Sequence, residues 1–373
     1  MANGTARQVQ FGPRAWGSRT GPAAGTLVPT EVGVNQPTIA DVARAAGVSV
    51  ATVSRALRGL DKVHPETRER VLAAASELDY ITSPTASGLA SGRTRLVGVI
   101  TPYMARWFFV EVISAIEKAL RQQDHHVLVM DLERSEAPSS RHSLDQRTLF
   151  KRVDGVVAIN VDMLDTEAEL VRQLALPVVT VGSRFDTAPR IGIDDVGTAT
   201  LAADHLLDLG HRRIAYIGKH FPGSAHTRTP SDRLAGFRAS LGARSISVPD
   251  EWIFESEWRA RDAFASALSL LRAEDRPTAI LAASDEMAIG ALAAARELGI
   301  RVPDDLSIVG IDDHELAEPF GLTTVRQNVV DQGVAAAEAL LAQLGLADPA
   351  LAVDRSFPVE LVLRRSTAAP TDR

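Results

Sequence analysis

A short run of small polar residues that ends in an arginine carries the residue types best suited to specific chemistry in this chain. The run covers residues 49–55 and reads Ser-Val-Ala-Thr-Val-Ser-Arg. At helical spacing Val53 turns toward a core, which leaves its neighbours free on the other face. Hydroxyl and guanidinium groups on such a face can form hydrogen bonds with the phosphates and base edges of duplex DNA. The residues of this face are Val50, Ala51, Thr52, Ser54 and Arg55.

Two short helices around one glycine would present that face. Thr38 and Asp41 fit the capping pattern of a helix that begins at Ile39, and Gly47 supplies the left-handed residue that ends it. Ser49 is placed to cap the second helix. The pattern is typical of a helix-turn-helix whose second helix enters the DNA major groove. The alternative is an ordinary helical hairpin without a role in nucleic-acid binding.

A third helix completes this small domain in the prediction. Pro65 suits its first turn, and apolar residues recur at helical spacing before Tyr80. The residues expected to close the core are Val71, Leu72, Ala75 and Leu78.

Composition restricts the class of protein. The chain has 373 residues, 45% of them hydrophobic, with a formal net charge of −7 and no cysteine. This length allows two or three soluble domains, and the lack of cysteine excludes disulfides and thiolate metal sites. No apolar run approaches the ~20 residues of a membrane helix. Because no secretory signal opens the chain either, we expect a cytoplasmic protein without a membrane partner.

Sequence signatures of enzymes are lacking in the second part of the chain. Residues 96–373 contain no glycine-rich nucleotide loop, no H-E-x-x-H metal helix and no G-x-S-x-G nucleophile turn. The nine histidines are scattered. We therefore expect no catalytic residue, no metal ion and no cofactor.

Beyond Arg93 apolar strands alternate with amphipathic helices. Residues 95–102 and 155–160 are typical of buried strands, whereas residues 108–123 have the spacing of a helix. The alternation continues to about residue 344. It predicts parallel sheets with helices on both faces and a ligand site at the carboxyl ends of the strands. The length fits two such sheets.

Residues 37–90 closely resemble the headpiece of the lactose-repressor/galactose-repressor family of bacterial regulators. The resemblance is carried by T-I-x-D-V-A-x-x-A-G-V-S-x-x-T-V-S-R, P-E-T-R-E-R-V and L-x-Y. It implies that Val50 and Ala51 make the variable base contacts and that Arg55 reads a base. It also implies that Ser49, Thr52 and Ser54 touch phosphates or base edges, and that the DNA backbone is anchored by Thr38, Thr67 and Tyr80.

A hinge helix over residues 83–92 is a further implication of the resemblance. In the family this helix forms on the operator, where Leu89 would enter the minor groove and kink the duplex. Ser83 can cap the helix and Pro84 can begin it, but Gly88 costs about 1 kcal/mol of helix propensity. We therefore expect the hinge helix to depend strongly on DNA.

From Leu96 to about Arg365 the chain is similar to the family's two-lobed domain, which is shared with periplasmic binding proteins. The motifs that carry this similarity are S-D-R-L-A-G-F-R, A-S-D-E-M-A-I-G and D-L-S-I-V-G-I-D-D. The similarity implies a cleft that encloses a small molecule, commonly a sugar or a nucleobase. It also implies three crossings between the lobes, expected near Ser183, Val325 and Ser356.

Matching these motifs assigns the residues of the cleft. Arg233 corresponds to an arginine that grips effector hydroxyls or carboxylates, and Asp312 to an acid that closes the cleft from the second lobe. Trp258 lies where sugar-responsive members place an aromatic plate, which favours a carbohydrate effector. Contributions from the first lobe are expected from Tyr103, Trp107 and Phe108. The remaining polar contacts assigned are Asn160, Ser284, Asp285 and Gln327.

Each of these residues has a simpler alternative role. Asp312 could cap the loop after a strand, and Arg233 could be an ion-pair partner on a helix surface. Trp258 could plug the edge of a lobe, and Asp285 could cap the helix that follows it.

The predicted architecture is an all-α helix-turn-helix headpiece followed by an α/β two-lobed effector domain that also dimerises. The predicted segments are a disordered extension (1–36), the headpiece (37–82), the hinge (83–92) and the effector domain (93–373). The first lobe is expected over about 95–183 and 326–356, and the second over about 184–325 and 357–366. The alternative for residues 1–36 is that they are not part of the native protein, because translation starts near Val34.

The expected function is that of a homodimeric transcriptional repressor that binds double-stranded operator DNA. Its operator affinity would be controlled allosterically by a small molecule, a carbohydrate, held between the lobes. The resemblance leaves open whether the effector releases or promotes DNA binding. The alternatives are a solute-binding protein of a sugar transport system and an α/β enzyme that uses the cleft of Arg233 and Asp312.

Overall fold

The computed structural model describes residues 37–57, 62–80, 93–132, 144–161, 163–185, 188–218, 228–256 and 258–371. The chain divides into two compact units, Met1–Thr82 and Ser83–Arg373. The predicted extension (1–36), the predicted hinge (83–92) and its Leu89 lie outside the described residues.

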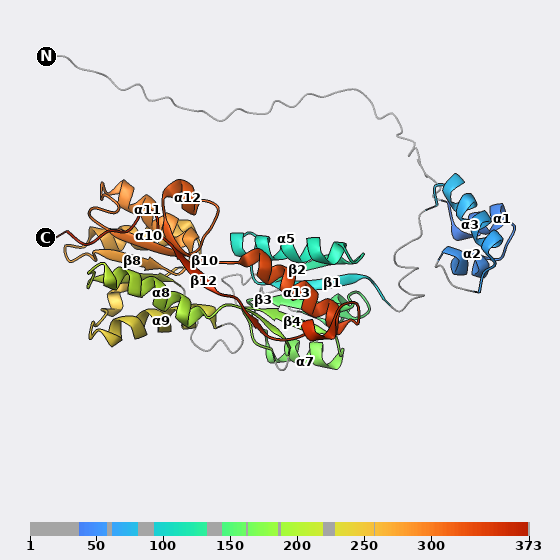
Figure 1. The fold of residues 1–373 in the computed structure, drawn as a ribbon, viewed down its shortest axis with the longest axis horizontal. Coiled ribbons are helices and arrows are strands. Elements are labelled where there is room, and N and C mark those ends of the chain that lie inside the picture. Colours follow the sequence, from blue (N-terminus) through green and yellow to red (C-terminus); the bar gives the residue numbers. More distant parts are fainter. Residues whose placement is uncertain are drawn as a thin grey trace, which may run out of the picture. The chain divides into compact units, whose positions relative to one another are not determined.

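The first unit holds a three-helix domain, shown in blue in Figure 1. Its helices are α1 (Ile39–Ala46), α2 (Val50–Leu57) and α3 (Pro65–Glu77). The predicted capping box is present, since the Thr38 hydroxyl accepts a hydrogen bond from the Asp41 N–H at 3.4 Å and the Asp41 carboxylate accepts one from the Thr38 N–H at 2.9 Å. The capping and turn signals of the sequence therefore define the start of this domain.

The core of this domain is small and apolar. Val42, Val53 and Val71 are completely buried at its centre. The prediction for Leu72 is wrong, because this side chain is 49% exposed and Ala74 is buried instead. The inward positions of α3 follow Val71 at spacings of three and four residues, and Leu72 falls on the next face of the helix.

The first lobe of the second unit is built on a parallel sheet. In the described residues this sheet has six strands, in the order β11-β5-β4-β3-β1-β2. The strands are β1 (Leu96–Thr101), β2 (His126–Asp131), β3 (Gly155–Ile159), β4 (Val178–Val181), β5 (Arg190–Gly192) and β11 (Arg355–Ser356).

Helices cover both faces of this sheet, as the alternating pattern predicted. On one face α5 (Trp107–Arg121) packs beside α13 (Val329–Gln343), and α7 (Asp165–Gln173) covers the other (Figure 1). The short α6 (Gln146–Leu149) also contributes to the second face through Leu149.

The second lobe repeats this arrangement. Its described strands form a six-stranded sheet in the order β12-β10-β9-β8-β6-β7, in which only β12 is antiparallel to its neighbour. The strands are β6 (Ile214–Gly218), β7 (Ile253–Glu255), β8 (Ala279–Ala282), β9 (Ser307–Asp312), β10 (Thr323–Gln327) and β12 (Val359–Val362).

Two pairs of helices flank the second sheet, one pair on each side in Figure 1. The pairs are α8 (Asp195–Asp208) with α9 (Thr229–Ala243), and α10 (Ala260–Arg272) with α11 (Asp285–Glu297). Short elements complete the fold: α12 (Ala317–Phe320), η1 (Asp250–Trp252) and η2 (Pro349–Leu351). None of these helices combines the length and the apolar composition needed to cross a bilayer.

The chain crosses between the lobes after β5, after β10 and after β11. The position predicted for the first crossing, near Ser183, is wrong. Beyond Ser183 the chain adds β5, which pairs in parallel with β4 and so extends the first lobe to Gly192. A strand of three residues has no apolar run long enough to reveal it in the sequence. The second crossing follows Gln327, and the third follows Ser356.

Candidate functional site

A cavity of about 110 Å³ lies between the two lobes. Its polar lining follows the carboxyl ends of strands, where the alternating pattern placed a ligand site. Asn160 follows β3, Ser284 follows β8, and Asp312 and Gln327 are the last residues of β9 and β10. The predicted residues that line the cavity are Tyr103, Phe108, Asn160, Arg233, Trp258, Ser284, Asp312 and Gln327.

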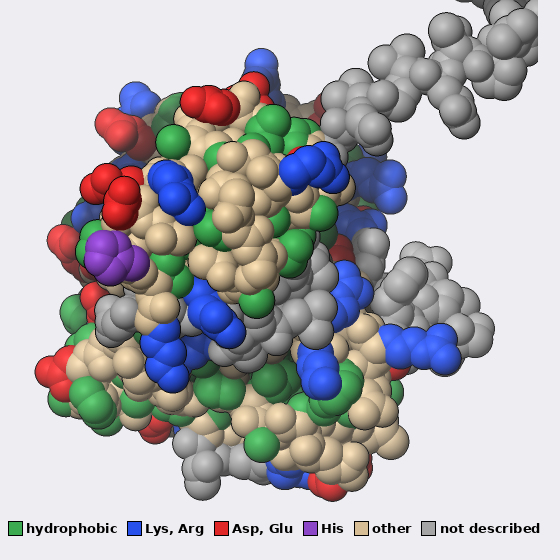
Figure 2. Space-filling view, turned by 90° about the vertical axis from the view of Figure 1, so that its right-hand side faces the viewer, with side chains coloured by type: hydrophobic (Ala, Val, Ile, Leu, Met, Phe, Trp, Pro, Cys, Tyr) green, Lys and Arg blue, Asp and Glu red, His purple; other side chains and the backbone are tan. Residues whose placement is uncertain are grey.

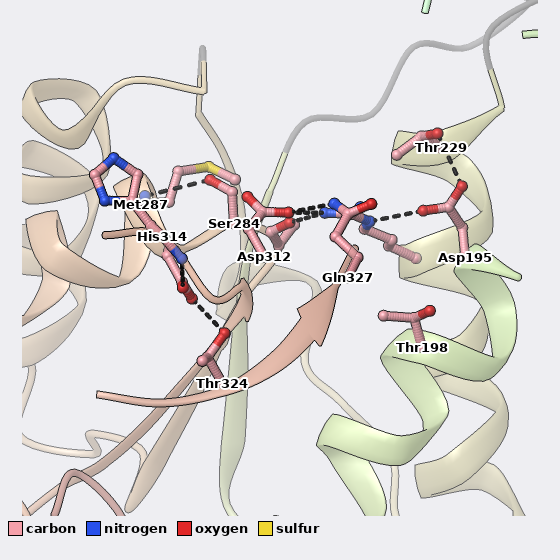
Figure 3. A network of polar contacts seen from close by, with 12 residues as sticks. Asp195, Thr198, Thr229, Ser284, Met287, Asp312, His314, Thr324 and Gln327 are labelled. Carbon is pink, nitrogen blue, oxygen red and sulfur yellow. Dashed lines mark hydrogen bonds and ion pairs between the residues drawn. The ribbon is translucent and has the colours of Figure 1, made fainter. Parts of the chain in front are cut away.

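Arg233 is the centre of a buried network of charges. Figure 3 shows Asp195 and Asp312, the two acids of this network, with Thr229 beside Asp195. Its side chain is 5% exposed, which rules out the alternative of a surface ion pair. Nε donates a hydrogen bond to Asp195 Oδ1 at 2.9 Å, and Nη1 lies 3.7 Å from Asp312 Oδ1 and bonds to the Ala283 carbonyl oxygen. Thr229 donates its hydroxyl hydrogen to the second Asp195 oxygen at 2.9 Å. The guanidinium is thus held in one orientation.

Burial and charge act in opposite directions on these groups. Burial raises the pKa of Asp312 to about 6, against the lowering effects of Arg233 and of a hydrogen bond that Gln327 Nε2 donates at 2.6 Å. Burial also lowers the pKa of Arg233, but the charges of Asp195 and Asp312 raise it by more. The pKa of Arg233 therefore lies above its ordinary value. The cavity therefore holds a charged arginine beside an acid whose pKa is raised by burial.

The two aspartates of the motif at the end of β9 have different roles. Asp312 faces the cavity, whereas Asp313 accepts hydrogen bonds from Arg326 at 2.7 Å and from Arg364 at 2.6 Å. Asp313, and not Asp312, therefore ties down the loop that follows the strand.

The assignment of Asp285 to the cleft is wrong. Its side chain is completely buried and accepts hydrogen bonds from the Thr324 hydroxyl at 2.7 Å and the His314 N–H at 2.9 Å. Burial raises its pKa to about 8, and Asp312 adds to that effect. The cap of α11 is Ser284, whose hydroxyl oxygen accepts from the Met287 N–H at 3.4 Å. Asp285 thus ties α11 to two neighbouring segments.

Aromatic rings form the apolar part of the cavity. Trp258 lines it, with its ring centre 5.9 Å from the Arg233 guanidinium carbon. Phe108 and Phe109 both contribute, at 5.4 Å between ring centres. The expectation for Trp107 is wrong, because it does not line the cavity and its ring lies 5.0 Å from that of His314.

Strained backbone coincides with this cavity. Asn160, Trp258 and Asp312 line it and adopt positive φ angles of 44°, 56° and 127°. Such conformations are rare for residues other than glycine and cluster at functional sites. The residues with a strained backbone therefore line the same cavity as the predicted effector-binding side chains.

Several residues of the lining were missed by sequence reasoning. Most lie at the start of a helix that follows a strand, which is the signal that could have found them. Glu286 is one example; burial raises its pKa to about 7, against the lowering effect of Arg106. The missed residues of the lining include Arg106, Asp195, Thr229, Glu286 and Gln332. No group of acidic and histidine side chains in the described ranges is arranged to hold a metal ion.

In the first unit, the face of α2 that the sequence singled out is open. Val50 is 45% exposed, Ala51 and Arg55 are exposed, and Thr52 and Ser54 are half-buried. Ser49 caps the helix, since its hydroxyl oxygen accepts a hydrogen bond from the Thr52 N–H at 3.2 Å.

The predicted backbone anchors belong to the same small domain but lie outside this helix. Thr67 is half-buried, Tyr80 packs against the core, and Thr38 holds the α1 cap. In the view of Figure 2, Lys and Arg side chains are scattered rather than gathered in one dense patch.

Both units match known families. The model of the bacterial regulatory proteins of the lacI family matches residues 38–83, and that of a periplasmic binding protein-like domain matches residues 203–367. Catabolite control protein A of Priestia megaterium is 32% identical over 303 residues, which are 80% of this chain and 90% of that protein. The chain belongs to the lacI family. It is a DNA-binding transcriptional regulator and not an enzyme. The matches confirm the expected family and the expected fold class.

Other transcriptional regulators are similar to this chain over most of their length. The HTH-type transcriptional repressor PurR of Vibrio vulnificus is 32% identical over 312 residues, which are 82% of this chain and 92% of that protein. The structure of the Lac repressor dimer bound to operator and the anti-inducer ONPF has a TM-score of 0.76 and 32% identity, and covers 89% of this chain and 99% of that one. The CelR–cellobiose complex has a TM-score of 0.62 and 27% identity, over 88% and 99% of the two chains.

Proposed function

We propose that this regulator is a repressor that binds its operator as a homodimer and changes its operator affinity when a carbohydrate occupies the cavity between the lobes. The observation that carries the proposal is the lining of that cavity, where a buried arginine, an aspartate and an aromatic ring meet from the second lobe. The Lac repressor, a relative of similar fold, has been seen as a dimer on operator with a small ligand. CelR, another neighbour, holds cellobiose.

The DNA-binding part of the proposal rests on the exposed face of α2. Arg55 is the residue we assign to base reading, because a guanidinium can form two hydrogen bonds with guanine in the major groove. Val50 and Ala51 are assigned to the adjacent base contacts. Ser49, Thr52 and Ser54 are assigned to phosphates and base edges, and the backbone anchors are Thr38, Thr67 and Tyr80.

The effector part of the proposal rests on complementary surfaces. A pyranose presents hydroxyl groups around an apolar ring face, and Trp258 offers a flat ring for that face. Arg233 and Asp312 offer a donor and an acceptor whose positions are fixed by their mutual contacts. Asn160 contributes from the first lobe and Ser284 and Gln327 from the second, so a bound sugar would contact both lobes.

Regulation follows from this shared lining. A ligand that contacts both lobes favours the arrangement in which all contacts are made, and it shifts the population by its difference in affinity between arrangements. Coupling of about 1–3 kcal/mol is usual for such effects. The crossings between the lobes and the first lobe itself would carry the change toward the DNA-binding unit.

The test is a gel mobility-shift experiment with the full chain. Duplexes selected from random sequence supply the operator, and a panel of neutral sugars is added at millimolar concentration. We expect at least one sugar to change the fraction of operator bound while leaving binding to unrelated DNA unchanged. Selection that enriches no sequence would contradict the proposal that the chain binds a specific operator. A bound fraction that stays unchanged with every sugar would contradict the proposal that the effector is a carbohydrate.

A further inference from the structure

Arg106 links the first lobe to the backbone of Trp258 in the second lobe. It precedes α5, and its Nη1 donates a hydrogen bond to the backbone carbonyl oxygen of Trp258. The residue is only 8% exposed, and its guanidinium carbon lies 5.0 Å from the centre of the Tyr103 ring. Arg106 is therefore held from its own lobe while it reaches into the other.

The acceptor of this bond sits in an unusual backbone conformation. Trp258 has a φ of 56°, in the left-handed region that residues with bulky side chains rarely adopt. Such a conformation persists only where surrounding contacts hold it. The hydrogen bond from Arg106 is made to the carbonyl group of that same residue, so it acts directly on the strained position.

An acidic group of the second lobe lies in the same cavity as Arg106. Glu286, in the first turn of α11 in the second lobe, lines the cavity with Arg106. Burial raises the pKa of Glu286 to about 7, and the charge of Arg106 opposes that effect. Arg106 therefore faces the second lobe through a hydrogen bond to the Trp258 carbonyl and through the opposite charge of Glu286.

We propose that Arg106 is a positioning residue that sets the Trp258 ring for an effector only while the two lobes are closed on each other. The inference deepens the proposed function, because it rests on Trp258 acting as the plate for a sugar. Opening the lobes removes the Arg106 donor from the Trp258 carbonyl, so the Trp258 ring is no longer held in position. An effector that stacks on the ring then makes this contact only in the closed arrangement. Its affinity therefore differs between the closed and the open arrangement, as a population shift requires.

The experiment uses the full chain labelled with 5-fluorotryptophan and needs no effector. The chain has four tryptophans, and the Trp258→Phe variant identifies the resonance of Trp258 in the ¹⁹F NMR spectrum. Trp252, which is 8% exposed and packs within the second lobe, serves as the internal reference. The solvent isotope shift between H₂O and D₂O reports how exposed each ring is.

We expect Arg106→Gln to move the Trp258 resonance and to increase its solvent isotope shift, while Trp252 stays in place. Arg106→Lys keeps a charged donor and should restore part of the change. The matched control is Arg121→Gln at the other end of α5, an exposed residue paired with Glu117, which should leave the spectrum of Trp258 unchanged.

Two results would overturn the proposal. One is a Trp258 resonance in Arg106→Gln that coincides with that of the unaltered chain. The other is a change at Trp252 as large as that at Trp258, because a general loss of structure would then explain both. If no sugar binds but Trp258 responds as expected, the proposed carbohydrate is wrong and the role of Arg106 in holding the ring stands.

Discussion

Replacement of Asp195 by asparagine tests the buried charge network most sharply. The substitution keeps the size of the side chain and removes the negative charge that Arg233 Nε contacts at 2.9 Å. Both side chains of this pair are 5% exposed, so solvent cannot replace the lost partner. A buried charge left without its counterion is expected to destabilise the second unit.

The magnitude follows from what remains around Arg233. Breaking a buried ion pair costs about 3–5 kcal/mol. Asp312 stays at 3.7 Å and the Ala283 carbonyl still accepts a hydrogen bond, so we expect the lower end, about 3 kcal/mol. For a unit that spans Ser83–Arg373 each kcal/mol lowers the melting temperature by about 1.5–2 °C, which gives a decrease of roughly 4.5–6 °C.

The assay is thermal unfolding of the full chain by differential scanning calorimetry at low ionic strength. The matched control is Asp208→Asn on the same helix, whose partner Arg244 lies at 2.7 Å but whose side chain is 70% exposed. Exposed pairs contribute about 0–1 kcal/mol, so the control should hardly change the melting temperature. A decrease of less than about 2 °C for Asp195→Asn, or an equal decrease for both variants, would refute the reasoning.

Three further predictions concern titration, recognition and folding. The pKa of Asp285 is raised to about 8 by burial, so its contribution to stability is complete below the ordinary value of 3.8 and is lost as the pH rises through 8. Asp285→Asn should therefore flatten the fall in melting temperature between pH 5 and about 8, and an unchanged slope would contradict this assignment. Arg55→Ala should weaken operator binding by about 1–3 kcal/mol without changing the melting-temperature shift caused by a sugar, and a loss of both responses would contradict separate sites. Thr38→Ala should destabilise the first unit by about 1 kcal/mol in denaturant unfolding, whereas Arg44→Ala, at an exposed side chain, should not; equal effects would argue against the capping box.

Local signals made most of the headpiece predictable from sequence. The cap at Thr38 and the left-handed Gly47 depend on neighbours within a few residues, and both appear in the structure. Leu72 was misplaced because it is apolar but lies one position from the buried stripe of α3. Hydrophobicity alone does not decide burial when two adjacent residues are both apolar.

The cavity was predictable where motifs end strands, as at Asp312 and Gln327, and less so elsewhere. Asp285 and Glu286 are adjacent acids at the start of one helix, and only the tertiary contacts decide which of them turns toward the cavity. Arg106 could not be assigned from sequence, because its partner at Trp258 is 152 residues away. Contacts between the lobes are fixed by topology and have no local signature.

The proposed regulation requires that a ligand between the lobes changes the affinity of the chain for DNA. The most direct measurement is the operator Kd by fluorescence anisotropy, with and without a saturating sugar that raises the melting temperature. We expect the Kd to change about 5- to 150-fold. We also expect Asp312→Ala, which removes an acceptor from the cavity, to abolish the change without altering the Kd for operator alone. An operator Kd that is the same with and without a sugar shown to bind would mean that the cavity does not control DNA binding.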